Sequence, residues 1–209
     1  LIDEYDKPLI DYLERDKLPL AFEHQSMLKN FYSILKSADP YLELLLITGV
    51  SKFSKVSMFS DLNNLEDLTL HRRFGDLLGY TQHELEINFA EWMRYILQWM
   101  PGETNASLLE KIKTWYNGYT WNTTDYVYNP FSILSFFSTG NFQDYWFKTG
   151  TPTFLVKKMQ EQQVFNLNNL KAGSAIFESF ALDNLDARSL LFQTGYLTHL
   201  HYVENPCVY

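Results

Sequence analysis

The sequence has few of the features that mark secreted, membrane-spanning or polybasic proteins. Its 209 residues include one cysteine, Cys207, so no disulfide can form within the chain. Apolar runs are short, as at residues 44–47, and fall far below the roughly 20 residues of a membrane span. The 17 Lys and Arg are outnumbered by 25 Asp and Glu, and the net charge of −8 excludes a histone-like or polybasic binder. With no stretch typical of a signal peptide, these absences predict a soluble, cytoplasmic protein without a membrane partner.

Aromatic residues, by contrast, are abundant, with 16 Phe, 14 Tyr and 5 Trp. Blocks at 115–116, 119–121 and 145–147 could stack on sugars or bases, or could pack a helical domain. Little positive charge lies near them, so we favour packing. The five histidines are scattered, and His199 with His201 lacks a third ligand, so we expect no zinc site.

The first 60 residues predict part of an α/β layer. Leu1 and Ile2 read as the end of a buried strand, and the chain starts with Leu rather than Met, as if inside an element. Helices are expected from about Pro8 to Arg15 and from Ser26, as N-cap, to Lys36. The apolar run 44–47 then reads as a strand buried on both faces, which is typical of a parallel sheet covered by helices.

Residues 61–165 predict a mainly helical lid. Thr81 and Glu84 form a capping-box pattern that starts a helix reaching Ile96. Further helices are expected at 108–116, 130–138 and 152–160, the last two introduced by Asn-Pro and Thr-Pro.

Residues 166–209 predict a third, truncated piece. A helix at 186–194, closed by Gly195, precedes an expected strand at 196–202 and a turn at Asn205-Pro206. A helix followed by a hairpin is typical of the end of a winged-helix unit. The expected fold is thus an incomplete P-loop NTPase parallel sheet (1–60), a helical lid (61–165) and the start of a winged-helix-like unit (166–209).

The acidic pair Asp3-Glu4 carries the clearest chemical signal. A carboxylate at the end of an apolar strand can hold Mg²⁺, and a neighbouring one can orient or deprotonate an attacking water. Thr48, at the end of the other expected strand, would place a hydroxyl near a terminal phosphate. The plainer alternative is that Asp3 and Glu4 only stabilise the first turn of the helix near Pro8.

Several blocks of residues, in order along the chain, resemble one family. The chain is similar to the AAA-ATPase-like family of bacterial proteins of unknown role, and the match covers nearly its whole length. The blocks are LIDEYDKP at 1–8, TGVSKFSKVS at 48–57, LNNL at 62–65, GYT at 79–81, WYNGY at 115–119, YNPFS at 128–132, YWF at 145–147, TGTP at 149–152 and GYLT at 195–198.

The resemblance implies a site that binds ATP and Mg²⁺. It implies Asp3 as the metal carboxylate, Glu4 as the catalytic base that polarises water, and Thr48 as the sensor. Lys52 and Lys55, just past the sensor, are candidates for contacts to nucleotide phosphates or to a nucleic-acid backbone, or are solvated loop lysines. The family commonly adds a downstream domain similar to PD-(D/E)xK nucleases.

One part of the family pattern is missing from the 209 residues. No G-x-x-x-x-G-K-[ST] occurs, and Gly49-Val50-Ser51-Lys52 comes nearest but lacks the first glycine. We therefore expect the phosphate-binding loop to lie upstream of Leu1, and these 209 residues alone neither to bind ATP tightly nor to hydrolyse it.

The function favoured by the sequence is ATP-dependent switching of a downstream effector, for which a nuclease acting on nucleic acid is one candidate. One alternative is a regulatory module that holds nucleotide with negligible turnover. Another is a carbohydrate-active domain, which needs two carboxylates facing a cleft. Arg72 and Arg73 are either an arginine finger or an ordinary surface pair, and the oligomeric state is not indicated.

Overall fold

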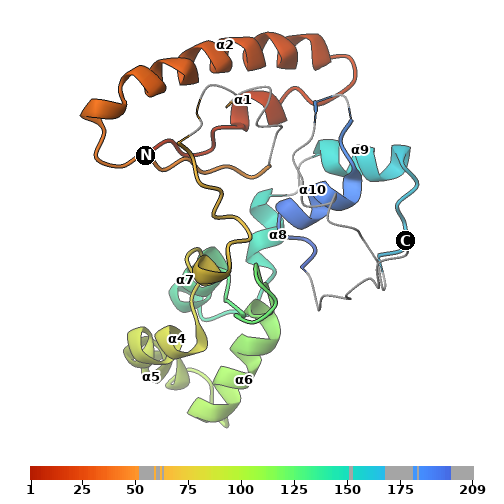
Figure 1. The fold of residues 1–209 in the computed structure, drawn as a ribbon. Helices are drawn as coiled ribbons and strands as arrows, with labels where there is room; N and C mark the ends of the chain where they lie inside the picture. The colour runs from red at the N-terminus through yellow and green to blue at the C-terminus, as the bar shows by residue number, and fades with distance from the viewer. Residues whose placement is uncertain are drawn as a thin grey trace, which may run out of the picture. The chain divides into compact units, whose positions relative to one another are not determined.

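The chain forms two compact units (Figure 1). The computed structural model describes residues 1–51, 59, 62, 64–150, 153–167, 181–182 and 184–198. One unit combines Leu1–Glu66 with Pro152–Leu197, and the other combines Asp67–Thr151 with Thr198–Tyr209. The units therefore do not follow chain order, because a late segment returns to pack with the first one. The predicted division into three domains stays a prediction.

Helices build the first unit. They are α1 (Lys7–Ile10), α2 (Leu18–Ser37), the 3₁₀ helix η1 (Asp39–Tyr41), α9 (Thr153–Glu161) and α10 (Ala187–Gln193). Helix α1 lies against α2, and α9 lies against α10. Their apolar side chains share one core, made of Leu9, Ala21, Leu155, Leu182, Leu185, Leu190 and Leu191.

Helix α2 begins eight residues before the predicted N-cap Ser26. Its first turn contains Pro19, a residue suited to a helix start since its missing N–H has no partner there anyway. The buried face carries Ala21 and Tyr32, which are 0% and 2% exposed. Phe31, from the apolar stripe seen in the sequence, is 52% exposed. Of the stripe, Leu28 packs against the core, so the stripe marks the face that packs inside the unit only in part.

The second unit is also helical. Its elements are η2 (Arg72–Phe74), α4 (Gln82–Asn88), α5 (Ala90–Leu97), α6 (Asn105–Tyr116), α7 (Pro130–Thr139) and α8 (Tyr145–Gly150). A core of buried apolar and aromatic side chains joins them: Leu85, Phe89, Met93, Ile96, Leu108, Ile112, Tyr116, Tyr128, Ile133, Phe136 and Phe137. Part of the aromatic excess of the sequence is thus used in packing, as predicted.

The predicted capping box is confirmed. Thr81 accepts from the Glu84 backbone N–H, and the Glu84 carboxylate accepts from the Thr81 N–H at 2.9 Å. The helix does not continue to Ile96, however. It breaks at Phe89, whose ring is buried and stacked on Phe137 with centroids 4.8 Å apart. A contact with a residue 48 positions away is invisible to helical periodicity, so the sequence did not predict the break.

The predicted parallel sheet is wrong for the described part of the chain, which holds helices but no strand. The only pairings described are three isolated bridges, Ile2 with Ile47 in parallel, and Tyr80 with Tyr128 and Tyr119 with Val127 in antiparallel orientation.

The apolar run 44–47 shows why the strand prediction fails. A parallel strand is stable when strands flank it and helices cover both of its faces. Here Leu44 is 78% exposed and Leu46 is 40% exposed, so the run is not covered in that way. Of this run, only Ile47 forms a bridge, and the left-handed backbone at Glu4 interrupts the regular pairing before Tyr5 contacts Thr48.

The start of the C-terminal piece agrees with the prediction. Helix α10 is capped by Asp186, whose carboxylate accepts from the Arg188 and Ser189 N–H groups, and Gly195 follows with a φ of 84°. Residues 199–209, which would complete the hairpin, lie outside the described residues. The winged-helix assignment stays a prediction.

Candidate functional site

The two segments singled out by the sequence lie side by side. Ile2 N–H donates to the Leu46 carbonyl at 2.9 Å, and Thr48 N–H donates to the Ile2 carbonyl at 2.8 Å. Tyr5 N–H then donates to the Thr48 carbonyl at 2.9 Å. Because the pairing is parallel, the carboxyl ends of both segments point the same way. The acidic pair and Thr48 therefore lie together at the carboxyl ends of the two segments.

Asp3 and Thr48 are in direct contact. The Thr48 hydroxyl donates a hydrogen bond to Asp3 Oδ1, which also accepts from the Glu4 N–H at 3.1 Å. Asp3 is exposed and Thr48 is half-buried. The other carboxylate oxygen and its remaining lone pairs are available to solvent, as a hard cation such as Mg²⁺ requires.

Glu4 has an unusual backbone conformation. Its φ is +50°, in the left-handed region that non-glycine residues seldom adopt. The turn interrupts the pairing between Asp3 and Tyr5, and it leaves Glu4 exposed beside Asp3. Strained backbone of this kind costs of order 1–3 kcal/mol and tends to occur at functional sites.

Asp6 lies beneath this turn and is fully buried. Its Oδ1 accepts from the Val50 N–H at 3.1 Å, and its Oδ2 accepts from the Ser51 N–H at 2.5 Å. Burial raises the pKa of Asp6 above its ordinary value, while these two hydrogen bonds act in the opposite direction. Sequence reasoning missed this role because a residue before Lys7-Pro8 looks like a helix cap, and no local pattern relates position 6 to position 50.

Gly49 and Tyr5 complete the contact between the segments. The Tyr5 hydroxyl donates to the Ser51 carbonyl at 2.7 Å. A Cβ at position 49 would come within 2.5 Å of the Tyr5 ring and 2.7 Å of Asp6 Oδ1. A glycine is therefore needed at this position for the two segments to approach.

The remaining predicted residues are two lysines and two arginines. Lys52 and Lys55 lie outside the described residues. Arg72 and Arg73 belong to the second unit, where the Arg72 carbonyl accepts from the Asn122 amide and Arg73 lies 5.9 Å from the centre of the Phe74 ring.

The described part of the chain shows neither a group of metal ligands nor a membrane-spanning helix. Within those ranges, no three His, Cys, Asp or Glu side chains are grouped so that they could hold a metal ion. Likewise, no helix there is both long and apolar enough to cross a membrane.

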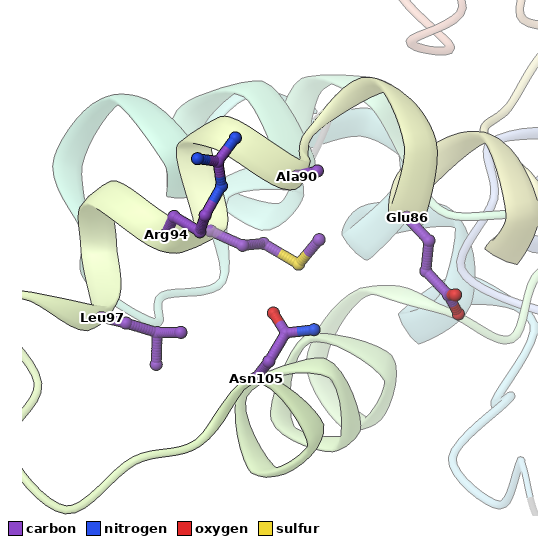
Figure 2. Close-up of a pocket in the computed structure, with 6 residues that line it drawn as sticks. Glu86, Ala90, Arg94, Leu97 and Asn105 are labelled. Atoms are coloured by element: carbon purple, nitrogen blue, oxygen red, sulfur yellow. The ribbon is translucent and has the colours of Figure 1, made fainter.

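A separate pocket of about 280 Å³ lies in the second unit (Figure 2). It is lined by Glu86, Ala90, Met93, Arg94, Leu97 and Asn105. Glu86 lies at the right of the view and Leu97 at the left, with Ala90, Arg94 and Asn105 between them. The lining includes one carboxylate and no aromatic ring, so the pocket does not supply the paired carboxylates and stacking surfaces of a carbohydrate-active site.

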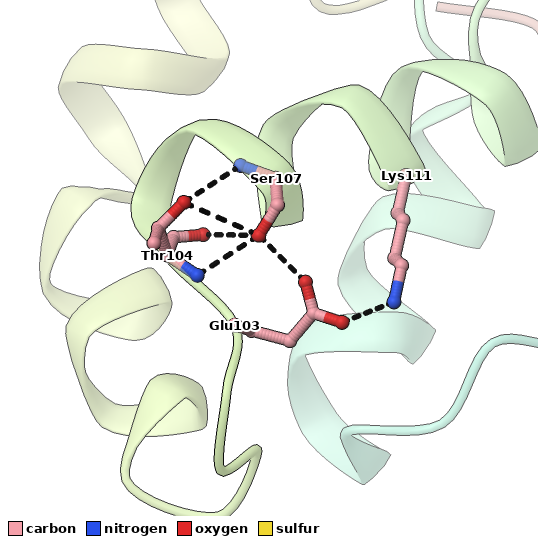
Figure 3. A network of polar contacts seen from close by, with 4 residues as sticks. All are labelled: Glu103, Thr104, Ser107 and Lys111. Atoms are coloured by element: carbon pink, nitrogen blue, oxygen red, sulfur yellow. Dashed lines mark hydrogen bonds and ion pairs between the residues drawn. The ribbon is translucent and has the colours of Figure 1, made fainter.

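A second polar cluster has a structural explanation (Figure 3). Glu103 contacts Lys111 and accepts from the Ser107 hydroxyl at 2.6 Å. Ser107 and Thr104 exchange the hydrogen bonds of a capping box at the start of α6. The contacts with Lys111 and Ser107 lower the pKa of Glu103. The polar contacts of the cluster therefore stabilise the N-terminal part of α6.

Comparison with known proteins relates this arrangement to one family. Residues 1–59 match the sequence model of the AAA-ATPase-like family, described as "Predicted AAA-ATPase". These residues include the Asp3 and Thr48 segments. The resemblance inferred from the motifs is thereby confirmed, and the downstream nuclease domain stays a prediction.

One curated relative aligns with nearly the whole chain. It is the "Uncharacterized protein in vnfD 5'region" of Azotobacter chroococcum mcd 1, which is 42% identical over 200 residues. The alignment covers 95% of this chain and 36% of that protein, so the chain spans about a third of its relative's length. No solved structure matches the chain.

Proposed function

We propose, from the membership of residues 1–59 in the AAA-ATPase-like family, that the protein binds ATP with Mg²⁺ and hydrolyses it to switch a downstream effector. The observation that carries the proposal is the contact between Asp3 and Thr48, which unites a carboxylate and a hydroxyl from segments 45 residues apart. The family match covers both segments, and the contact adds that their side chains meet.

Each residue has a proposed role in this function. Asp3 coordinates Mg²⁺, directly or through water, with the oxygens that Thr48 and the Glu4 N–H leave free. Glu4 is the base that orients and deprotonates the attacking water. Thr48 senses the terminal phosphate by exchanging its hydrogen bond to Asp3 for one to the nucleotide. Such an exchange would couple the state of the nucleotide to the second segment.

The phosphates also need a cradle of backbone N–H groups and a lysine. These 209 residues contain no G-x-x-x-x-G-K-[ST], so the proposal assigns that loop to sequence outside them. Lys52 and Lys55, which follow the sensor, are proposed as additional phosphate contacts. A nuclease as the effector, with nucleic acid as its partner, rests on the family resemblance alone.

The test compares Glu4→Gln with the wild type, using the protein as its gene encodes it. Loss of a general base typically costs 10²- to 10⁴-fold in rate, so we expect Mg²⁺-dependent ATP hydrolysis to fall at least about 100-fold. ATP affinity should change by less than about threefold, because the amide keeps the size of the carboxylate. Glu23→Gln, at an exposed position of α2, is the matched control and should behave as the wild type.

The outcomes separate this proposal from its alternatives. Tight ATP binding by the wild type with negligible turnover would favour the regulatory module instead. Absence of both binding and hydrolysis in the intact protein would refute the proposal.

A further inference from the structure

We infer that Asp6 is a positioning residue that holds the Thr48 segment against Asp3 by binding the backbone of residues 50 and 51 with both oxygens of its carboxylate. The inference deepens the proposed ATPase function and rests on it. Nothing in the AAA-ATPase-like motif itself distinguishes Asp6 from an ordinary helix cap.

The hydrogen bonds of Asp6 reach across the site rather than along its own helix. Asp6 occupies the N-cap position of α1, yet its side chain caps no N–H of that helix. Its two oxygens instead accept from Val50 and Ser51, at 3.1 and 2.5 Å. A capping contact normally stabilises a helix. Here that contribution is absent, and the carboxylate links segments 44 and 45 residues apart.

The geometry requires a carboxylate of this length. Two backbone N–H groups approach two different oxygens, and the side chain is 0% exposed, so no water replaces a lost acceptor. An asparagine has the same shape but offers one oxygen, and its amide group would meet an N–H donor. Asp6→Asn is therefore a nearly isosteric change that removes one of the two contacts.

Tyr5 makes further hydrogen bonds to the same turn. The Tyr5 hydroxyl donates to the Ser51 carbonyl, while the Tyr5 N–H donates to the Thr48 carbonyl. The backbone is thus held by hydrogen bonds at the Thr48 carbonyl and again at residues 50 and 51. These hydrogen bonds fix the backbone from which the Thr48 hydroxyl reaches Asp3, which explains how a buried residue can act on an exposed site.

The test measures the turn and the reaction separately, in the full-length protein. Amide hydrogen exchange at Val50 and Ser51 should be at least about tenfold faster in Asp6→Asn than in the wild type. The kcat for ATP should fall about 10- to 100-fold, the scale expected from misplacing a reacting group by about 1 Å, with KM within about threefold. Asp11→Asn, at an exposed position just after α1, is the matched control for both measurements.

A double-mutant cycle tests whether Asp6 acts through Thr48. In a Thr48→Ala background, Asp6→Asn should reduce kcat by less than about twofold further. An independent, multiplicative loss would overturn the inference, as would faster exchange with an unchanged kcat. Unchanged exchange at both amides would show that the two hydrogen bonds do not hold the turn, and would also overturn it.

The exchange measurement and a second variant separate failure of the inference from failure of the proposed function or of folding. If the wild type has no ATPase activity, the proposed function fails, and the exchange measurement still decides whether Asp6 holds the turn. If Asp6→Asn does not fold, Tyr5→Phe removes the hydrogen bond from the Tyr5 hydroxyl to the Ser51 carbonyl while keeping the ring. It should lower kcat at least threefold with KM unchanged, and an unchanged kcat would contradict the inference.

Discussion

Single residues decide how closely the two segments of the candidate site approach. Gly49 is the clearest case, because its backbone lies outside the region reserved for glycine, and the space around it is what excludes a side chain. Asp6 is the opposite case, since a carboxyl group is buried there and, among the described residues, accepts hydrogen bonds from the backbone N–H groups of Val50 and Ser51.

Gly49→Ala should destabilise the first unit by about 1–3 kcal/mol, the usual cost of overpacking. The added Cβ would lie 2.5 Å from the Tyr5 ring, which cannot move without disturbing its hydrogen bond to Ser51. Urea unfolding followed by far-ultraviolet circular dichroism measures the effect. Ser37→Ala, at the exposed end of α2, is the control and should lie within about 0.5 kcal/mol of the wild type. A neutral or stabilising Gly49→Ala would show that the segments are farther apart than described.

Glu84 should make the stability of the second unit depend on acidic pH. Hydrogen bonds from the Thr81 N–H and hydroxyl lower the pKa of Glu84, so the folded protein holds its proton less tightly than the unfolded chain. The stabilisation is therefore present at pH 7 and is lost as the pH falls through about 4.3, the ordinary pKa of glutamate, and below.

The measurement is the melting temperature of wild type and Glu84→Gln from pH 7 to pH 3, followed by tryptophan fluorescence. The wild type should melt higher at pH 7, and the difference should vanish near pH 3. Glu110→Gln, exposed on α6, should show no such pH-dependent difference. A difference independent of pH would mean that the charge of Glu84 plays no part.

At the scale of elements, the start of a helix is set by contacts between residues close in the chain, whereas its continuation also depends on distant contacts. Thr81, Thr104, Asn129 and Asp186 all accept hydrogen bonds from backbone N–H groups of the first turn. These contacts involve residues two or three positions apart, so the starts at Thr81, Asn129 and Asp186 were predicted, whereas the start of α6 was placed at residue 108, past its cap Thr104. The start of α2 was missed because Ser26 resembles a cap while Pro19, earlier in the chain, begins the helix.

Thr104→Ala should cost the second unit about 1 kcal/mol. The Ser107 N–H would lose its acceptor at 3.2 Å, and Ser107 would have one partner fewer in the network around Glu103. Urea unfolding followed by tryptophan fluorescence reports the change, since Trp115 lies in α6. Thr114→Ala on the same helix removes a bond to the Glu110 carbonyl within the helix interior, and should cost nothing measurable. Equal losses for the two variants would contradict the capping argument.

At the scale of the whole molecule, the described residues form two cores, and the first unit is helical where the sequence predicted an α/β layer over residues 1–60. The core of the first unit includes Leu155 and Leu190, far along the chain from Leu9. Apolar periodicity identifies amphipathic segments but does not say which segments share a core. The return of residues 152–197 to the first unit is therefore a result that only the structure provides.

Core truncations should act mainly within their own unit. Leu190→Ala and Ile133→Ala each remove a fully buried side chain, and each should cost about 2–5 kcal/mol. All five tryptophans, at positions 92, 99, 115, 121 and 146, belong to the second unit. Tryptophan-monitored unfolding should therefore shift for Ile133→Ala and remain nearly unchanged for Leu190→Ala, which circular dichroism should detect. Equal shifts in the tryptophan signal would show that the two units unfold as one.

The sequence by itself indicated the resemblance to the AAA-ATPase-like family, which the match of residues 1–59 confirms, and the helix starts at Thr81, Asn129 and Asp186, because ordered motifs and caps depend on residues close together in the chain. The roles of Asp3, Glu4 and Thr48 stay predictions. Only the tertiary structure decided the rest. It showed that the expected sheet is reduced to a single parallel bridge between Ile2 and Ile47 in the described residues, and that Asp6 binds the turn after Thr48. Both results depend on contacts more than 40 residues apart, whose energies come from burial and hydrogen bonding that no local pattern encodes.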